Sequence, residues 1–296
     1  MRITINSILC GLLLGSFPAI AQLEAGFTLG VANAFTDLGG GKDLGKFGIK
    51  DLDIAATRPA LGGFLRQTPN AFFSWRLQLS LAWITADDDF VPSYLSGAHL
   101  ARWYRNQDFK TAIIELAFLG EFNILRFEHG RYRYRHTPYA VGGFALFWFD
   151  PRARDGTRLK PLRTEGQGLP QYPDRKPYAS IQPAIPLGFG YKYNINKSWT
   201  IGFEMVFKFT FTDYLDDVSK TYPDPAYYYE EFPEQQAQVM DAYSNRWKER
   251  CETGDCVMFK PGDQRGDPTD FDHYGFLGMI TISYLVKQGK LYCPKF

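Results

Sequence analysis

Long hydrophobic runs are missing from most of this 296-residue sequence. Beyond the first 21 residues, no segment has the roughly 18 consecutive apolar residues that a membrane-spanning helix needs. The chain also has almost no net charge, because its 33 Lys and Arg residues are balanced by 32 Asp and Glu residues. The balance gives no reason to expect a nucleic-acid or strongly acidic partner.

Catalytic motifs are also missing. None of the four histidines lies in HExxH and no serine lies in GxSxG. A hydrolase built on a barrel needs His, Ser and a carboxylate at one membrane interface, and no such set can be assembled. We therefore expect neither an enzyme nor a cofactor nor a small-molecule substrate.

Acidic clusters occur at residues 87–89 and at Asp213, Asp216 and Asp217. Carboxylates are calcium ligands, but the spacing matches no EF-hand loop. We expect these acids to be solvated loop residues or caps at strand ends, with calcium binding as the alternative.

Cysteine is scarce, with four in the chain. Cys10 lies in a short apolar stretch that follows Arg2 and precedes Ala19-Ile20-Ala21, the layout of a cleaved secretory signal over residues 1–21. Export would leave one domain, 22–296, in a compartment that permits disulfides. Cys251 and Cys256 can then pair across a short loop or belong to a metal site. Cys293 would be a free thiol, an intermolecular one, or a partner of one of these two.

What the sequence does have is aromatic residues, at 17% of the chain, set in alternating segments. Alternation with period two and aromatic ends is the signature of a membrane barrel. In residues 73–84, for example, Trp75, Leu79 and Trp83 lie on one edge and Arg76 and Gln78 on the other. Eight such segments are found, at 23–35, 58–67, 73–84, 111–124, 137–149, 181–193, 199–211 and 274–286.

The connections between these segments alternate in length. The second, fourth and sixth segments are followed by short turns, and the first, third, fifth and seventh by the long stretches 36–57, 85–110, 150–180 and 212–273. Outer-membrane barrels have short periplasmic turns and long extracellular loops, whereas a soluble sandwich or lipocalin has no reason to sort its loops in this way. The sequence therefore predicts an all-β, eight-stranded antiparallel transmembrane outer-membrane β-barrel with a long loop at 213–272.

Six charged residues fall on the edges that would face the lumen: Arg76, Glu115, Glu121, Lys192, Glu204 and Lys208. An eight-stranded barrel is just wide enough for side chains to fill it, and buried charges must be paired. We expect a polar network of ion pairs that plugs the lumen, with an ion path as the alternative.

The turn after the fourth segment, RFEHGRYRYRH at 126–136, carries Arg126, Arg131, Arg133 and Arg135 between tyrosines. It either extends the fifth strand or forms a contact surface for a periplasmic partner. The tail KQGKLYCPKF at 287–296 would lie on the same side, with Cys293, Lys295 and Phe296 as candidate contacts.

Several stretches resemble the PorG family, outer-membrane barrels of the type IX secretion system. They include LRTEGQG at 162–168, FTDYLDDVSKTYPD at 211–224 and GDQRGDPTDFDHYGF at 262–276, as well as the strand segments from RPALGGFLRQ and TPYAVGGFALFWFDP. The resemblance implies a structural component rather than a catalyst. It also implies association with the periplasmic ring of the lipoprotein PorK with PorN, which the barrel would anchor or organise at the outer membrane. A small porin-like or surface-binding barrel unrelated to secretion is the alternative.

Overall fold

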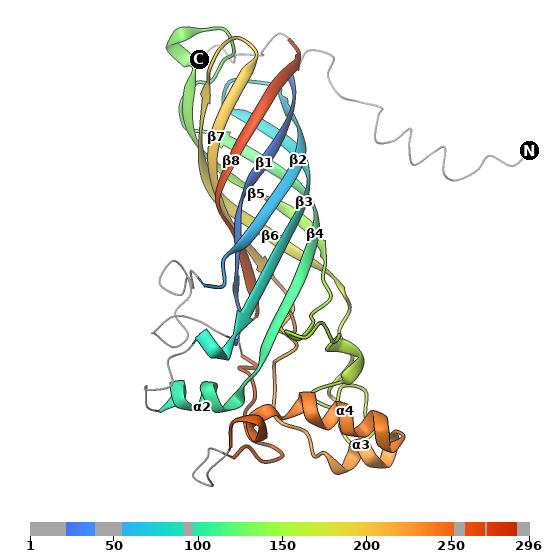
Figure 1. The fold of residues 1–296 in the computed structure, drawn as a ribbon. Coiled ribbons are helices and arrows are strands. Elements are labelled where there is room, and N and C mark those ends of the chain that lie inside the picture. Colours follow the sequence, from blue (N-terminus) through green and yellow to red (C-terminus); the bar gives the residue numbers. More distant parts are fainter. Residues whose placement is uncertain (1–21, 39–54, 91–96, 252–257, 270, 289–296) are drawn as a thin grey trace, which may run out of the picture.

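The chain forms one closed barrel of eight antiparallel strands in chain order, with β1 paired to β8 (Figure 1). The computed structural model describes residues 22–38, 55–90, 97–251, 258–269 and 271–288. The predicted signal segment 1–21 lies outside these residues. The strands are β1 (Gln22–Phe35), β2 (Arg58–Thr68), β3 (Phe73–Asp87), β4 (Asp108–Asn123), β5 (His136–Trp148), β6 (Ile181–Asn194), β7 (Trp199–Thr210) and β8 (His273–Lys287). The predicted barrel class is confirmed, and each predicted strand overlaps an observed one.

The outer face of the barrel is an apolar belt. Along β3 the side chains that point outward run from Phe73 through Leu77 and Leu79 to Trp83, and all four are exposed, Leu79 to 58%. The ten-residue step from Phe73 to Trp83 rises about 33 Å along the strand, which a tilt of about 40° reduces to about 25 Å of height. That height matches the lipid-facing band of an outer-membrane barrel.

One strand changes its phase midway. In β8 the pairing with both neighbours slips at Leu277–Met279, and Gly278 takes a φ of 63°, the left-handed conformation that favours glycine in a β-bulge. Before this bulge Tyr274 and Phe276 are buried in the lumen, and after it Thr281 and Ser283 are. The bulge therefore keeps polar and aromatic side chains inside although the simple alternation breaks.

Three short connections close the end at which β1 starts and β8 ends. The connection between β4 and β5 folds over this end of the barrel, with Phe127 and His129 buried. The His129 ring contacts Gln22 Oε1 at 3.1 Å and Thr200 Oγ1 at 3.0 Å. Because β5 begins only at His136, this turn does not extend strand five. That alternative for the arginine-rich segment is therefore wrong.

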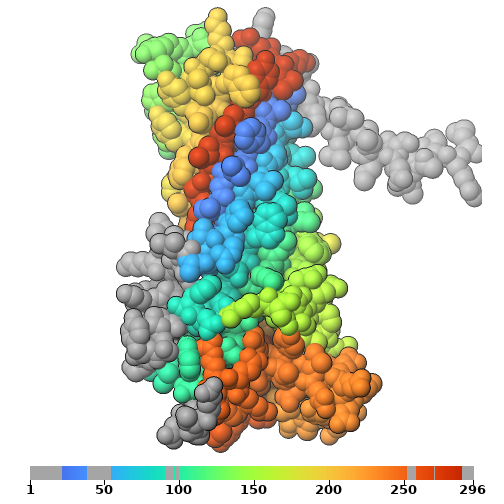
Figure 2. Space-filling model, in the orientation of Figure 1, coloured from blue at the N-terminus to red at the C-terminus, as the bar shows by residue number. Residues whose placement is uncertain are grey.

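The four long connections fold together at the opposite end into a cap, which we define as the described residues between β1 and β2, β3 and β4, β5 and β6, and β7 and β8. The cap contains α2 (Ala98–Arg105), α3 (Ala226–Glu231) and α4 (Glu234–Ser244), and the single turns η2 (Asp88–Phe90), η4 (Lys160–Leu162) and η5 (Arg246–Arg250). Figure 2 shows the strands as oblique bands along a tall wall, with the cap below them. No helix in the described part of the chain is long and apolar enough to cross a membrane.

Candidate functional site: the charged lumen and the cap

The lumen holds a cluster of alternating charges that we call the lumen cluster: Glu24, Arg66, Arg76, Glu121, Lys192 and Glu204. Glu121 is its centre, with Oε1 at 3.0 Å from Arg66 Nε and 3.2 Å from Arg76 Nη1, and Oε2 at 2.7 Å from Lys192 Nζ. The side chain of Glu121 is fully buried. Glu121 therefore forms ion pairs with all three cations of the cluster, and other carboxylates must supply the remaining negative charge.

Two further carboxylates complete the cluster. Glu204 accepts hydrogen bonds from Arg76 Nη2 at 2.5 Å and from the Tyr139 hydroxyl at 2.7 Å. Glu24 accepts from Arg66 Nη1 at 3.2 Å and from Ser283 Oγ at 2.7 Å. The cluster thus has three acids and three bases and no net charge, which is what burial of ionised groups requires.

Nearer the cap, Lys208 and Glu115 form a separate pair. Lys208 Nζ donates to Glu115 Oε1 at 2.7 Å, and the Tyr274 hydroxyl donates to Oε2 at 2.7 Å. All three side chains are almost completely buried. The structure therefore places all six residues proposed for the lumen network inside the barrel and gives each of them a partner of opposite charge.

Sequence reasoning missed four members of this network, namely Glu24, Arg66, Tyr139 and Tyr274. Glu24 precedes Ala25 and so lies on the inner edge of β1, but a single acid near a strand end gave little signal. The alternation of β2 is interrupted by Gly62 and Gly63, which hides the phase of Arg66.

Both tyrosines lie on strands whose phase is hard to read. β5 has apolar residues on both edges, so Tyr139 does not stand out, and the bulge in β8 separates Tyr274 from the residues that follow. Charge balance gave no further signal, because the six predicted lumen residues already comprise three acids and three bases and a tyrosine is neutral.

The cap has a buried polar centre of its own, the cap cluster: Asp88, Arg105, Glu165, Asp217 and Arg265. Arg105 binds Asp88 with both ends of its guanidinium, at 2.8 and 2.7 Å, a strong fork-like arrangement. Arg265 Nη1 lies 3.1 Å from Glu165 Oε1 and donates to the Asp217 carbonyl at 2.7 Å. Arg105 also donates to the Arg265 carbonyl at 2.8 Å, which joins the two halves.

The cap cluster unites stretches far apart in sequence. Glu165 comes from LRTEGQG, Asp217 from FTDYLDDVSKTYPD and Arg265 from GDQRGDPTDFDHYGF. Glu165 also accepts the backbone N–H groups of Ser219 and Lys220 at 2.9 and 3.0 Å. These three loop stretches therefore meet in one cluster that holds the loops to one another.

Of the two alternatives for the loop acids, solvated residues or caps at strand ends, the solvated one is wrong for Asp88, Asp216 and Asp217, which are fully buried. Asp88 is held by Arg105, Asp216 accepts the backbone N–H groups of Leu38 and Val218, and Asp217 accepts the hydroxyls of Thr164 and Tyr178. Residues at the outer ends of strands become buried when loops fold over them, which a strand pattern does not reveal.

Burial also changes the acidity of this region. It raises the pKa of Asp213 to about 9, and the neighbouring carboxylates of Asp37 and Asp216 add to the rise. The pKa of Asp216 is raised to about 8, again by burial first and by Asp37 second. Among the described residues, no three His, Cys, Asp or Glu side chains are grouped so that they could hold a metal ion.

The arginines of the 126–136 turn lie on the surface at the opposite end. Arg131 and Arg133 are exposed, and Arg126 and Arg135 lie over the rings of Tyr134 and Tyr132 at 4.7 and 4.0 Å. Cation–π contacts of this kind keep the guanidinium groups outward and ordered. The tail residues Cys293, Lys295 and Phe296 lie outside the described residues. Cys251 is disulfide-bonded, and its proposed partner Cys256 also lies outside them.

Two of three comparisons with known proteins give matches. A family model described as "Domain of unknown function (DUF6089)" matches residues 11–232. Among solved structures, Ail, the attachment invasion locus protein of Yersinia pestis in complex with the heparin analogue sucrose octasulfate, is 9% identical with a TM-score of 0.34, covering 89% of this chain and 96% of that chain. The outer membrane protein OprG from Pseudomonas aeruginosa is 7% identical with a TM-score of 0.36, covering 90% and 95%. The comparison with curated proteins gives no match.

Proposed function

The chain belongs to the DUF6089 family, and from this premise we propose that it is an integral outer-membrane barrel with a structural role in the type IX protein secretion system. In this role it anchors or organises the periplasmic ring of PorK and PorN and carries out no chemistry of its own. The proposal joins the PorG resemblance of the loop motifs to the architecture of the barrel. Its apolar belt fits a bilayer, and export by a cleaved signal would deliver it there.

The observation that carries the proposal is the filled interior. Charged and aromatic side chains fill the lumen from the short-turn end to the cap. At the cap end, the cap cluster joins the long loops to one another. A barrel whose lumen is filled with side chains has no channel through which cargo can pass. Its role in transport is therefore to bind and position other components of the secretion system. The partner surface then lies at the short-turn end, where Arg126, Arg131, Arg133 and Arg135 gather.

Site-specific photo-crosslinking in intact cells tests this assignment. A photoreactive residue placed at Tyr132, which is 79% exposed on the turn, should give a crosslink to the ring lipoprotein PorK or to PorN. The matched control is Tyr229, another exposed tyrosine, which lies in α3 of the cap and should give none.

Deletion of the gene should abolish export of secretion cargo, and the purified protein should carry ring components with it. Crosslinks from Tyr132 to no periplasmic protein, together with normal cargo export by the deletion strain, would contradict the proposal. A crosslink from Tyr229 to an extracellular protein would instead favour a surface-binding barrel.

A further inference from the structure

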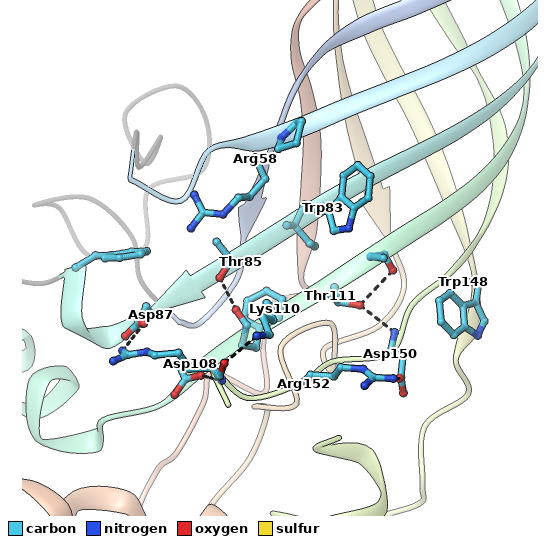
Figure 3. Close-up of a pocket in the computed structure, with 16 residues that line it drawn as sticks. Arg58, Trp83, Thr85, Asp87, Asp108, Lys110, Thr111, Trp148, Asp150 and Arg152 are labelled. Carbon is cyan, nitrogen blue, oxygen red and sulfur yellow. Dashed lines mark hydrogen bonds and ion pairs between the residues drawn. The ribbon is translucent and has the colours of Figure 1, made fainter. Parts of the chain in front are cut away.

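A pocket of about 650 Å³ opens on the outside of the barrel, where β2 to β5 meet the cap (Figure 3). Two tryptophans and four cations are among the residues that line it: Arg58, Trp83, Lys110, Trp148, Arg152 and Arg154. Figure 3 shows Trp83 and Trp148 on the barrel wall, with the side chains of Arg58, Lys110 and Arg152 spread over the same pocket. None of the residues that line this pocket belongs to the lumen cluster or to the arginine-rich turn at 126–136.

The pocket lies at the border of the apolar belt. Trp83 and Trp148 are the last apolar side chains on the outer edges of β3 and β5. On β4 the outward positions change from Ile114, which is 47% exposed, to Lys110 within four residues. Tryptophan and lysine side chains at the end of a lipid-facing strand mark the level of the lipid head groups.

Positive charge exceeds negative charge in this pocket. Four cations face three lining acids, and each acid is already bound by arginine. Asp87 pairs with Arg154, Asp108 with Arg246, and Asp150 with both Arg152 and Arg158.

Two of the cations have no acidic partner among the described residues. Lys110 Nζ donates to the Arg154 carbonyl at 2.8 Å, and Arg58 donates to the carbonyls of Ala55 and Thr57. Arg152 is 47% exposed at its side chain although it pairs with Asp150. These three side chains can therefore donate to an anion that enters the pocket from the membrane surface.

We propose that this pocket binds the anionic phosphate head group, one with net negative charge, of a lipid in the outer leaflet. The phosphate would accept hydrogen bonds from Lys110, Arg152 and Arg58, while the acyl chains follow the belt below Trp83 and Trp148. Specific ligand pockets typically measure about 300–1,000 Å³, so this pocket of about 650 Å³ can hold a lipid phosphate together with the glycerol that carries it. The inference relies on the proposed function only for the orientation of the barrel in the membrane.

A titration of the purified full chain in neutral detergent tests the inference. Three water-soluble probes are compared: dihexanoyl phosphatidic acid, dihexanoyl phosphatidylcholine and inorganic phosphate. Binding is followed by tryptophan fluorescence, since two tryptophans line the pocket, and by native mass spectrometry. We expect saturable binding of one phosphatidic acid, with at least tenfold weaker binding of the other two probes.

The variant Lys110→Gln/Arg152→Gln should weaken phosphatidic acid binding by on the order of tenfold or more, because each charge-assisted hydrogen bond contributes well over a factor of five. Arg58→Gln is a second variant that breaks no ion pair among the described residues. Arg133→Gln/Lys197→Gln removes the same number of charges at the turn end and should bind as the wild type does.

Three results would overturn the inference: equal binding of the phosphatidylcholine probe, equally tight binding of inorganic phosphate, or unchanged binding by both pocket variants. None of them bears on the secretion role, which rests on crosslinking at the other end of the barrel.

Discussion

Removing the central carboxylate of the lumen cluster should destabilise the barrel strongly. In Glu121→Gln the side chain keeps its size but loses the charge that lies 3.0, 3.2 and 2.7 Å from Arg66, Arg76 and Lys192. Breaking a buried ion pair by removing one partner typically costs about 3–5 kcal/mol, and here the cluster changes from neutral to one uncompensated positive charge. With total stabilities of about 5–15 kcal/mol, such a loss is a large fraction of the whole.

The assay is equilibrium unfolding by urea of the protein refolded into phosphatidylcholine vesicles, followed by tryptophan fluorescence. We expect Glu121→Gln to lower the free energy of unfolding by about 3–5 kcal/mol. The double variant Glu121→Gln/Lys192→Met leaves two acids and two bases, so it should recover part of the loss. Glu234→Gln, at the exposed start of α4, serves as the control and should change the free energy by less than about 0.5 kcal/mol.

The reasoning would be refuted by a Glu121→Gln protein within about 1 kcal/mol of the wild type, a change expected of an exposed pair. It would also be refuted by a double variant no more stable than the single one, because neutrality of the cluster would then be irrelevant. A lumen filled with water would give both results.

Three more predictions concern the filled lumen and the cap. In planar bilayers the wild-type barrel should show no steady conductance, and a stable open level would contradict the filled lumen. Burial raises the pKa of Asp213 to about 9, so the folded cap holds a proton that the unfolded loop releases, and cap stability should fall as the pH rises from about 4 toward 9. Protease cleavage of the cap should therefore be faster at pH 9 than at pH 6, and Asp213→Asn should flatten this difference; an equal pH response in both proteins would exclude Asp213 as its source. Glu165→Gln leaves Arg265 buried without its carboxylate and should open the cap to protease while the barrel itself stays folded, whereas uncut loops would show that the pair is dispensable.

The strands could be predicted because side chains in a barrel wall alternate between the lipid and the lumen along each strand. β3 and β7 alternate without interruption, so their lipid-facing and lumen-facing edges are visible in the sequence, and three of the six predicted lumen charges, Arg76, Glu204 and Lys208, follow directly. The rule fails where the backbone departs from it, as at Gly278 in β8.

The cap could not be predicted in the same way. Its helices are short, some of its contacts join residues more than a hundred positions apart, and several of its acids are buried by neighbours that no local pattern identifies. Arg105 and Arg265 are separated by 160 residues yet are joined by a hydrogen bond of 2.8 Å. The loop motifs signalled that the region was distinctive, but only the fold reveals that they bind one another.

Because the first strand pairs with the last, the positions of the chain termini can be moved without changing which strands are paired. Leu23 lies opposite Lys287, and β1 is paired with β8 along most of its length, so the seam of the barrel is an antiparallel strand pair like the other junctions, apart from its shifts in register. A circular permutant that joins β8 to β1 through a short linker and opens the turn between β6 and β7 would keep all eight junctions. Its new ends would emerge next to the arginine-rich turn, which would make them attachment points for probes on the partner-facing side.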